Sequence, residues 1–277
     1  MRTSLFFVLL LSRICNAQAP GDALVTAEKG FAALSARTTT RGAFLYYLDS
    51  SSVVFNQGKI LNGYTRWSRD IPEDNSLLLW RPEFALLSAS GDFGCTMGAS
   101  EYRPDRSAQT AGQFGHFASL WHRSAGGRWS VLCNIGVQHS DPAADENRVV
   151  RKVLQRAGSM SLDSTEAAAR EGQLIEGIKA GRSDLLKQYS SPDAWILLAG
   201  RQPVRSREMD DFDEAVPGHY LFEPAAGHWL SPAGDMLVSY GRTTANGRTT
   251  ANGRAANYMW VWGQERGKWQ LMMMVMN

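Results

Sequence analysis

The sequence has few of the features that identify membrane proteins, nucleic-acid-binding proteins or the commonest enzyme classes. Beyond the N-terminus, no apolar run is long enough to cross a membrane. The 277 residues carry a formal net charge of +2 and no basic cluster, so the charge pattern of a nucleic-acid-binding protein is missing. The sequence also lacks a GxSxG nucleophile elbow, a P-loop and a glycine-rich dinucleotide fingerprint. It therefore predicts neither a nucleic-acid partner nor a nucleotide cofactor.

Residues 1–19 have the pattern of a secretory signal peptide. Arg2 supplies a positive start, Leu5 to Leu11 form a short apolar core, and Ala17-Gln18-Ala19 offers the small residues that a signal peptidase requires. This apolar core is too short to span a bilayer, so we expect a removed leader and not an anchor. The mature chain is expected to be periplasmic or secreted, without a membrane partner after the signal has been removed.

Removal of residues 1–19 would leave two cysteines, Cys95 and Cys133. An exported pair of cysteines suggests a disulfide. The strand pattern, however, places the two residues two strands apart, at a spacing of about 9–10 Å, which is beyond the reach of a disulfide bond. We therefore predict two free, buried thiols that pack as small apolar side chains.

The order of expected elements indicates an α+β protein. The spacing of apolar residues predicts an amphipathic helix over 22–37 and a second helix over 42–48, and Asn62 is a candidate cap for a third. Five β-rich runs between Leu77 and Val137 follow, separated by glycine-rich and proline-containing turns. Helices followed by strands favour helices packed on one face of an antiparallel sheet. The runs Leu77–Trp80 and Phe84–Leu87 do not alternate, which is typical of strands covered on both faces.

The second half of the sequence resembles the first. Ser231 to Asp235 matches Ser88 to Asp92 at an offset of 143, and Trp262 matches Trp121 at an offset of 141. So small a drift in register predicts an internal duplication. We expect a signal peptide over 1–19, a first domain over 20–139, a linker over 140–164 and a degenerate second domain over 165–277. The two domains would pack sheet on sheet as a pseudo-dimer within a monomeric chain.

Several blocks of the first half carry a family resemblance. These blocks are Leu79 to Ala85, Ser90 to Gly98, Gly115 to Phe117 with Leu120-Trp121, Gly127 to Val131, and Asn134 to Gly136. They resemble the SnoaL-like group called domain of unknown function 4440, in the nuclear-transport-factor-2-like superfamily. The resemblance implies a cone-shaped α+β domain, with a curved sheet wrapped around a pocket. The superfamily contains isomerases, dehydratases and proteins without catalysis, so the resemblance alone predicts no activity.

Five residues are candidates for lining such a pocket: Tyr64, Trp67, Trp80, His116 and Asn134. Relatives usually carry an aspartate where Asn134 stands, and an amide can orient a ligand but cannot titrate. His116 could act as a general base or be a satisfied imidazole. The three aromatic residues could stack on a ligand or belong to the core. His116 and His122 share a strand face without a third ligand at a suitable spacing, so we expect no metal site.

These observations favour an exported protein that binds a small apolar or amphipathic molecule without catalysis and without a cofactor. Two alternatives remain open. The first is an isomerase, dehydratase or hydrolase that uses His116 or Tyr64 in the first-domain pocket. The second is a protein–protein interaction module that uses an exposed sheet face. The closing run Gln270 to Met276 is apolar on both faces, so the pocket of the second domain is expected to be filled or purely apolar.

Overall fold

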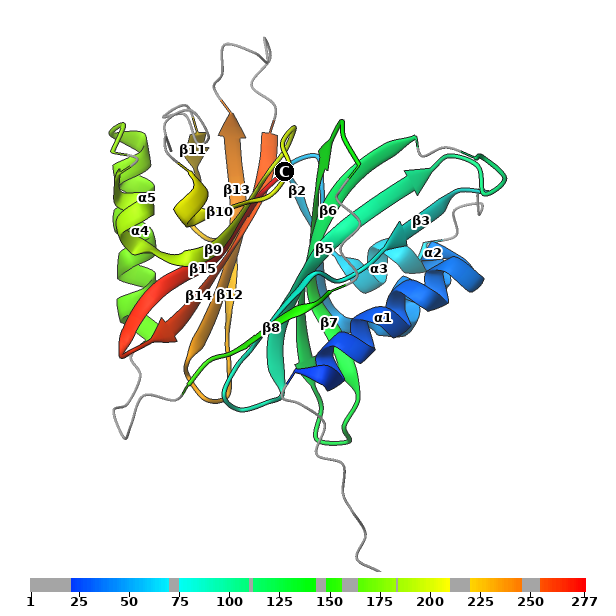
Figure 1. Cartoon of the computed structure of the whole chain (residues 1–277), viewed down its shortest axis with the longest axis horizontal. Helices are drawn as coiled ribbons and strands as arrows, with labels where there is room; N and C mark the ends of the chain where they lie inside the picture. Colours follow the sequence, from blue (N-terminus) through cyan, green and yellow to red (C-terminus); the bar gives the residue numbers. More distant parts are fainter. Residues whose placement is uncertain are drawn as a thin grey trace, which may run out of the picture.

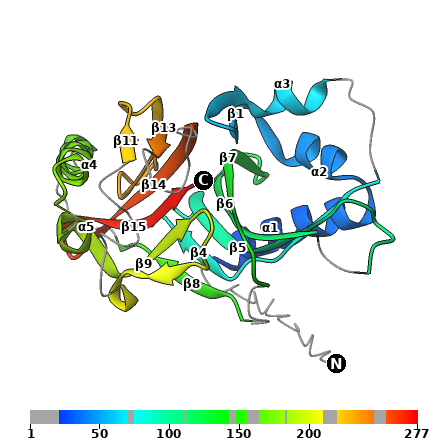
Figure 2. The ribbon, with the colours of Figure 1, turned by 90° about the horizontal axis from the view of Figure 1, so that it is seen from above.

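The computed structural model describes residues 21–69, 75–109, 112–142, 148–155, 164–182, 184–209, 220–245 and 255–277. The expected signal peptide lies outside these residues. The chain forms two curved, mixed β-sheets that face each other, and the helices cover the outer face of each sheet (Figure 1). The view from above shows the same layers, with α1–α3 on one outer side and α4–α5 on the other (Figure 2). Among the described residues, no helix is long and apolar enough to cross a membrane.

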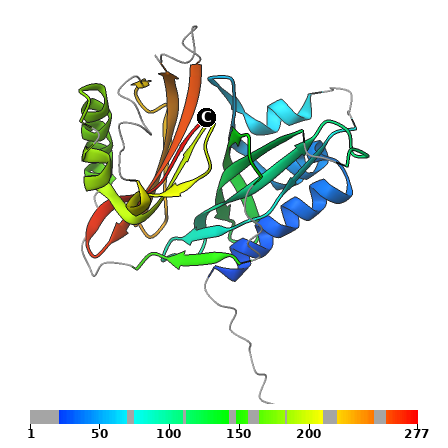
Figure 3. The ribbon, with the colours of Figure 1, turned by 45° about the horizontal axis from the view of Figure 1, so that its top comes forward.

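The first half of the chain builds sheet A and the helices that cover it. Its helices are α1 (Asp22–Arg37), α2 (Thr40–Tyr47) and α3 (Gly63–Ser68). Its strands are β1 (Leu48–Asn56), β2 (Lys59–Asn62), β3 (Leu77–Trp80), β4 (Phe84–Leu87), β5 (Phe93–Arg103), β6 (Gln113–Arg123), β7 (Trp129–His139) and β8 (Val150–Val153). They lie in the order β2-β1-β7-β6-β5-β4-β8. Strand β3 is on the same side of β5 as β4 and pairs with the C-terminal part of β5. Helix α1 runs across sheet A and packs on β3, β4 and β5 (Figure 3).

The second half builds sheet B in a similar order of elements. Its helices are α4 (Ser164–Lys179) and α5 (Asp184–Tyr189), with a 3-10 turn at Ser206–Glu208. Its strands are β9 (Ser190–Leu198), β10 (Val204–Arg205), β11 (Tyr220–Phe222), β12 (Gly227–Leu230), β13 (Met236–Ala245), β14 (Ala255–Glu265) and β15 (Lys268–Met276). They lie in the order β10-β9-β15-β14-β13-β11, with β12 paired to β13. Strand β9 pairs in parallel with β15, as β1 pairs with β7 in sheet A.

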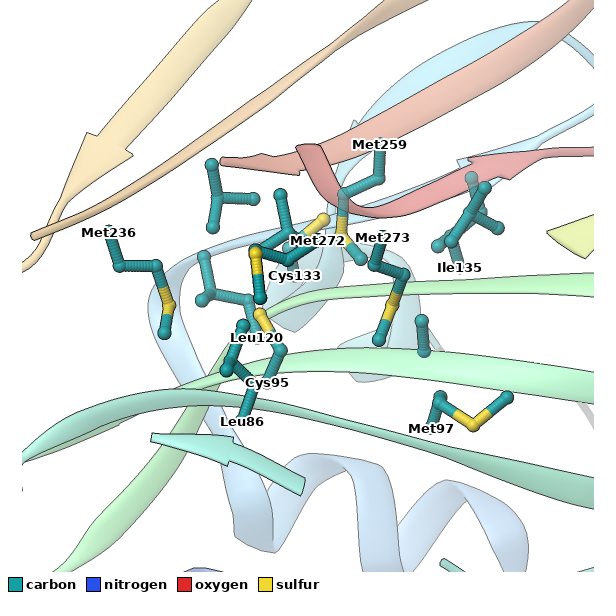
Figure 4. Close-up of a cluster of buried hydrophobic side chains, with 14 of the residues drawn as sticks. Leu86, Cys95, Met97, Leu120, Cys133, Ile135, Met236, Met259, Met272 and Met273 are labelled. Carbon is teal, nitrogen blue, oxygen red and sulfur yellow. The ribbon is translucent and has the colours of Figure 1, made fainter. Parts of the chain in front are cut away.

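The two sheets bury one continuous apolar cluster between them (Figure 4). Sheet A contributes Leu86, Cys95, Met97, Leu120, Cys133 and Ile135, and sheet B contributes Met236, Met259, Met272 and Met273. Methionine suits this position because its unbranched side chain fills irregular gaps between two curved surfaces. Both cysteines are free and buried, as the strand order predicted. Burial raises the pKa of each thiol, so both are held in the uncharged form.

Many local predictions agree with the structure. Helix α1 has the expected bounds, and Asn62 caps α3 by accepting a 2.7 Å hydrogen bond from the Thr65 backbone N–H. All four residues of β4 are buried. Phe84 and Leu86 face the cluster between the sheets, whereas the alternate positions Ala85 and Leu87 pack under the helices. The apolar run is therefore explained by cover on both faces.

Two expectations need correction, and one strand is irregular. The sheets are mixed and not purely antiparallel, because β1, β8 and β9 each pair in parallel with a strand distant in sequence. The stretch 140–164, expected to be a linker, contributes β8 to the edge of sheet A. In β7, a bulge skips Leu132 between the pairs Leu120–Cys133 and Trp121–Val131. Val131 therefore packs on the helix side and Leu132 between the sheets, which is the reverse of strict alternation.

Candidate ligand-binding site

A cavity of about 200 Å³ lies between the helices and the helix-covered face of sheet A. Six of its lining residues are aromatic, and the others are aliphatic or neutral polar residues and glycines. They are Phe31, Phe44, Leu78, Trp80, Ser100, Tyr102, Gln113, Phe114, Gly115, Phe117, Asn134, Gly136, Val137 and Gln138. An engineered apolar cavity of about 150 Å³ holds a benzene molecule, so this cavity can hold a small ring system.

Strand pairing explains why these residues converge. Register in sheet A sets Ser119 opposite Asn134, Phe117 opposite Gly136, and Gly115 opposite Gln138. Because alternate residues of a strand point to the same face, these positions of β6 and β7 share the helix side of the sheet. Helices α1 and α2 close the cavity with Phe31 and Phe44, whose rings meet edge to face at 4.9 Å. The cavity is therefore formed by elements that are far apart in sequence.

Amide groups provide most of the polar surface of the cavity. Asn134 Nδ2 donates a 3.0 Å hydrogen bond to Ser119 Oγ, which orients the Asn134 amide on the floor. At the rim, Gln138 Nε2 donates to Gln113 Oε1 at 2.8 Å. With its amide nitrogen engaged by Ser119, the carbonyl oxygen of Asn134 can accept a hydrogen bond from a bound molecule. This geometry suits a ligand that carries one hydroxyl or N–H group.

A buried carboxylate lies behind the aromatic wall. Glu28 of α1 is fully buried, and its Oε1 accepts a 2.6 Å hydrogen bond from the Trp80 indole N–H. Its Oε2 accepts from Thr96 Oγ1 at 2.6 Å and from the Trp121 indole N–H at 2.9 Å. Burial raises the pKa of Glu28, although these hydrogen bonds oppose the shift. Glu28 thus holds Trp80, a cavity residue, while its own oxygens are covered.

Of the five residues predicted from sequence, the structure brings Trp80 and Asn134 together on the cavity wall. Tyr64 lies on α3 and is 45% exposed. Trp67 stacks on the ring of Phe44 at 4.5 Å and supports this cavity residue without lining the cavity. His116 lies between two cavity residues of β6, Gly115 and Phe117, and therefore points to the opposite face. The expectation that Tyr64, Trp67 and His116 line the pocket is corrected accordingly.

The sequence analysis missed Glu28, as it missed most residues of the cavity wall. A signal for it existed, because Glu28 follows Leu24 by four residues and precedes Phe31 by three, which places it on the buried face of the helix. An acid at such a position must find hydrogen-bond donors in the core. The donors are a threonine and two tryptophans on three different strands, and only the fold brings them together.

The second half has a buried carboxylate like Glu28 but no counterpart of the polar pair Ser119 and Asn134. Glu171, 143 positions after Glu28, accepts hydrogen bonds from Ser239 Oγ at 2.5 Å and from the Trp262 indole N–H at 2.9 Å. Burial raises its pKa as well. In sheet B, the strand pair that corresponds to Ser119 and Asn134 consists of Trp260 and Met274, and both are fully buried. These two large side chains occupy the space that the smaller polar pair leaves open in the first half.

The described part of the chain contains no group of three or more histidine, cysteine, aspartate or glutamate side chains arranged to hold a metal ion. The side chains that line the cavity offer aromatic rings, amides and hydroxyl groups. Such a lining can stack on a ring, accept and donate hydrogen bonds, and exclude water.

Comparisons with known proteins give similarities to solved structures only. No family model matches the chain, and no curated protein matches it. A nuclear-transport-factor-2-like protein of Cytophaga hutchinsonii aligns with 12% identity and a TM-score of 0.32, over 40% of this chain and 93% of that protein. A similar protein of unknown function from Shewanella oneidensis aligns with 9% identity and a TM-score of 0.31, over 41% of this chain and 97% of that protein.

A hexachlorocyclohexane dehydrochlorinase of Novosphingobium barchaimii aligns with 14% identity and a TM-score of 0.33, over 41% of this chain and 84% of that enzyme. Similarities of this size carry no argument about activity. The narrower resemblance to domain of unknown function 4440 stays a prediction.

Proposed function

We propose that the cavity of the first half binds one small, neutral, aromatic or apolar molecule without transforming it. The main support is the composition of the cavity wall, in which six residues are aromatic and three carry amide side chains. No side chain of the wall is cationic or a carboxylate. An uncharged ring gains from contact with these surfaces, whereas a charged ligand would lose its hydration without finding a partner. The oxygen of Asn134 would select ligands that carry a single donor group.

The positions of the titratable residues favour binding over catalysis. Proton transfer needs an acid or base within about 3 Å of the reacting atom. Glu28 is fully buried behind Trp80, and both of its oxygens accept hydrogen bonds. His116 and Tyr64, the candidates for an enzyme, lie outside the cavity. The third candidate function, an interaction module, required an uncovered apolar sheet face, whereas the inner faces of the two sheets cover each other.

We further propose that the two halves are diverged copies of one domain, packed as a pseudo-dimer. Equivalent buried contacts at equal spacing support this interpretation, because Leu24, Glu28 and Phe31 on α1 correspond to Ala167, Glu171 and Leu174 on α4 at a constant offset of 143. The second copy would serve as a permanent cover for sheet A. The signal-like N-terminus adds the proposal that binding takes place after export, in a periplasm or outside the cell.

The proposal is tested with 2-naphthol, a neutral two-ring probe with one hydroxyl group, and with its charged analogue 2-naphthoate. We expect 2-naphthol to bind one site per chain in isothermal titration calorimetry and 2-naphthoate to bind at least about tenfold more weakly, since its charge would be desolvated. Asn134→Met, which introduces the residue found at the corresponding position of β15, should fill the cavity and abolish binding. Tyr64→Ala is the matched control and should bind as the wild type does. Equal binding of the two probes, or unchanged binding to Asn134→Met, would overturn the proposal.

A further inference from the structure

A chain of three titratable side chains lies on the other face of sheet A, where the two halves meet. His116 Nε2 lies 3.3 Å from Glu83 Oε2, and His116 Nδ1 lies 2.8 Å from His139 Nε2. His139 Nδ1 in turn lies 2.7 Å from the backbone carbonyl oxygen of Asp141. Both imidazoles are buried. No element of the proposed binding function uses this chain of contacts.

The chain ends on atoms that connect the two halves. The same Asp141 carbonyl oxygen accepts a 3.0 Å hydrogen bond from Gln202 Nε2, which belongs to the turn after β9 of sheet B. In the same turn, the Gly200 N–H donates to the Gln138 carbonyl oxygen at 2.6 Å. His139 therefore holds a carbonyl group to which the second half is also bound.

Hydrogen-bond directions fix where the protons lie. A carbonyl oxygen only accepts, so His139 carries its proton on Nδ1, and a neutral His139 must accept on Nε2. His116 must then donate from Nδ1. A neutral His116 would point the lone pair of its Nε2 at the carboxylate of Glu83, so one further proton is needed between these two atoms. This proton lies in the hydrogen bond between His116 Nε2 and Glu83 Oε2, and the Arg81 guanidinium lies 3.2 Å from the other carboxyl oxygen, Glu83 Oε1.

A second proton has no acceptable place in this arrangement. If His139 were also protonated, two N–H groups would face each other across 2.8 Å, and two cationic rings would be in contact. Among the residues that the structure describes, the other charged groups near the pair are Glu83 with Arg81, next to His116, and Asp141, next to His139. Burial, reinforced by the charge of His116, lowers the pKa of His139 below its usual value of 6.5.

We propose that Glu83, His116 and His139 form a proton-operated latch between the two halves. One proton on His116 belongs to the closed latch, and a second proton taken up by His139 opens it. The two cationic rings then separate, and His139 is displaced from the carbonyl group that it shares with Gln202. The junction at Gly200 and Gln202 loosens at acidic pH, whereas the apolar cluster between the sheets contains no group that titrates in this range.

The first test is nitrogen-15 NMR of the histidine side chains in the full-length protein, which has only five histidines. At about pH 7.5, above the usual histidine pKa, we expect His139 to be neutral with its proton on Nδ1, and His116 to carry a proton on Nδ1. The variants His116→Gln and His139→Gln assign the signals. A His116 without a proton on Nδ1, or a His139 that carries its proton on Nε2, would overturn the proposal without any further variant.

The second test measures hydrogen exchange at the Gly200 amide, expressed as a protection factor so that the intrinsic effect of pH is removed. From about pH 7 to about pH 5, protection should fall by as much as tenfold for each unit by which the pKa of His139 is lowered. His139→Gln should show no such fall. His122→Gln, a substitution of the other histidine of β6, should behave as the wild type does. A fall that persists in His139→Gln, or that is lost in His122→Gln, would show that the latch is not the cause.

Discussion

Ser88 Oγ donates a 2.5 Å hydrogen bond to Asp235 Oδ1 and thereby ties a turn of the first half to the matching turn of the second. The Ala89 backbone N–H donates to the other oxygen of Asp235 at 2.7 Å. A symmetric pair of domains would repeat both bonds from the second turn to Asp92. The residue that corresponds to Ala89 is Pro232, however, which has no N–H to donate. This contact between the halves is therefore one-sided.

We expect Asp235→Ala to cost about 3 kcal/mol or more of unfolding free energy, because two buried hydroxyl donors, Ser88 Oγ and Ser231 Oγ, and the partly buried Ala89 N–H would lose their acceptor. Asp92→Ala, at the corresponding position of the first turn, should cost less than about 1 kcal/mol, since Asp92 is only partly buried. Urea denaturation of both variants measures the difference. Equal losses would show that the two turns contribute symmetrically and that the contact is not one-sided.

The two buried carboxyls should give stability a characteristic dependence on pH. The pKa of Glu28 is raised in the folded state, so the folded chain binds a proton that the unfolded chain has lost. The stabilising contribution of this proton is complete below the usual glutamate pKa of 4.5 and is lost as the pH rises through the folded-state pKa. Urea denaturation of the wild type and Glu28→Gln at about pH 4.5 and pH 7.5 should show the larger advantage of the wild type at the lower pH.

Glutamine also supplies one acceptor oxygen fewer than a carboxylate. Glu28→Gln should therefore cost about 1–3 kcal/mol at low pH, the penalty for one buried donor left without a partner. Glu171→Gln provides the internal control, because Glu171 is also buried and accepts hydrogen bonds from a hydroxyl and an indole N–H, but has no contact with the cavity wall. Both variants should lose stability, and only Glu28→Gln should weaken the binding of 2-naphthol. A weakening of the same size in Glu171→Gln would contradict the positioning of Trp80 by Glu28.

The two reciprocal substitutions at the corresponding positions, Asn134→Met and Met274→Asn, should change the unfolding free energy by different amounts. Met274→Asn would bury an amide next to Trp260, where the serine that pairs with Asn134 is absent, and would also leave a void. We expect a loss of about 2–5 kcal/mol. Asn134→Met enters an existing cavity and should change stability by no more than about 1 kcal/mol. Denaturation curves of the two variants in parallel provide the measurement, and a large loss in Asn134→Met would argue that its amide is structural.

The thiols of Cys95 and Cys133 should be inert in the native protein. Both are buried between the sheets, and burial raises the pKa of each, so little reactive thiolate forms. A thiol reagent such as dithionitrobenzoate should react with them only after unfolding, at a rate limited by the opening of the interface between the sheets. Rapid reaction of the folded chain, with Cys15 replaced by serine so that it does not contribute, would show that the two sheets separate readily.

The sequence alone was sufficient for elements whose pattern is local. The bounds of α1, the cap of α3 and the run of strands from β3 to β7 follow from apolar spacing and turn residues. Parallel pairing of β1 with β7 was not predictable, because its partners are more than 70 residues apart and leave no periodic signal. The same holds for β8, a four-residue strand with a polar sequence that is placed by its pairing with β4.

The site was predicted only in part, for a related physical reason. Alternation shows that His116 and Phe117 point to opposite faces, but it does not show which face holds the cavity when both are apolar. In this chain both faces of sheet A are covered, one by helices and the other by sheet B. Asn134 and Trp80 do lie on the cavity wall, and their role in ligand binding stays a prediction. Glu28 was overlooked because helical periodicity was assessed by its apolar members, and a buried acid among them is visible only once its donors are in place.

The second half has Trp260 and Met274 where the first half has Ser119 and Asn134, and this difference bears on how the two halves can diverge. In a homodimer, one gene specifies both subunits, so any mutation that fills one cavity fills the other. Within the proposed pseudo-dimer each copy has its own codons, and a site can be lost on one side while it is kept on the other. The copy without a cavity is then free to vary its interior for rigidity, and the copy with one can adapt to its ligand without having to satisfy the needs of an identical partner.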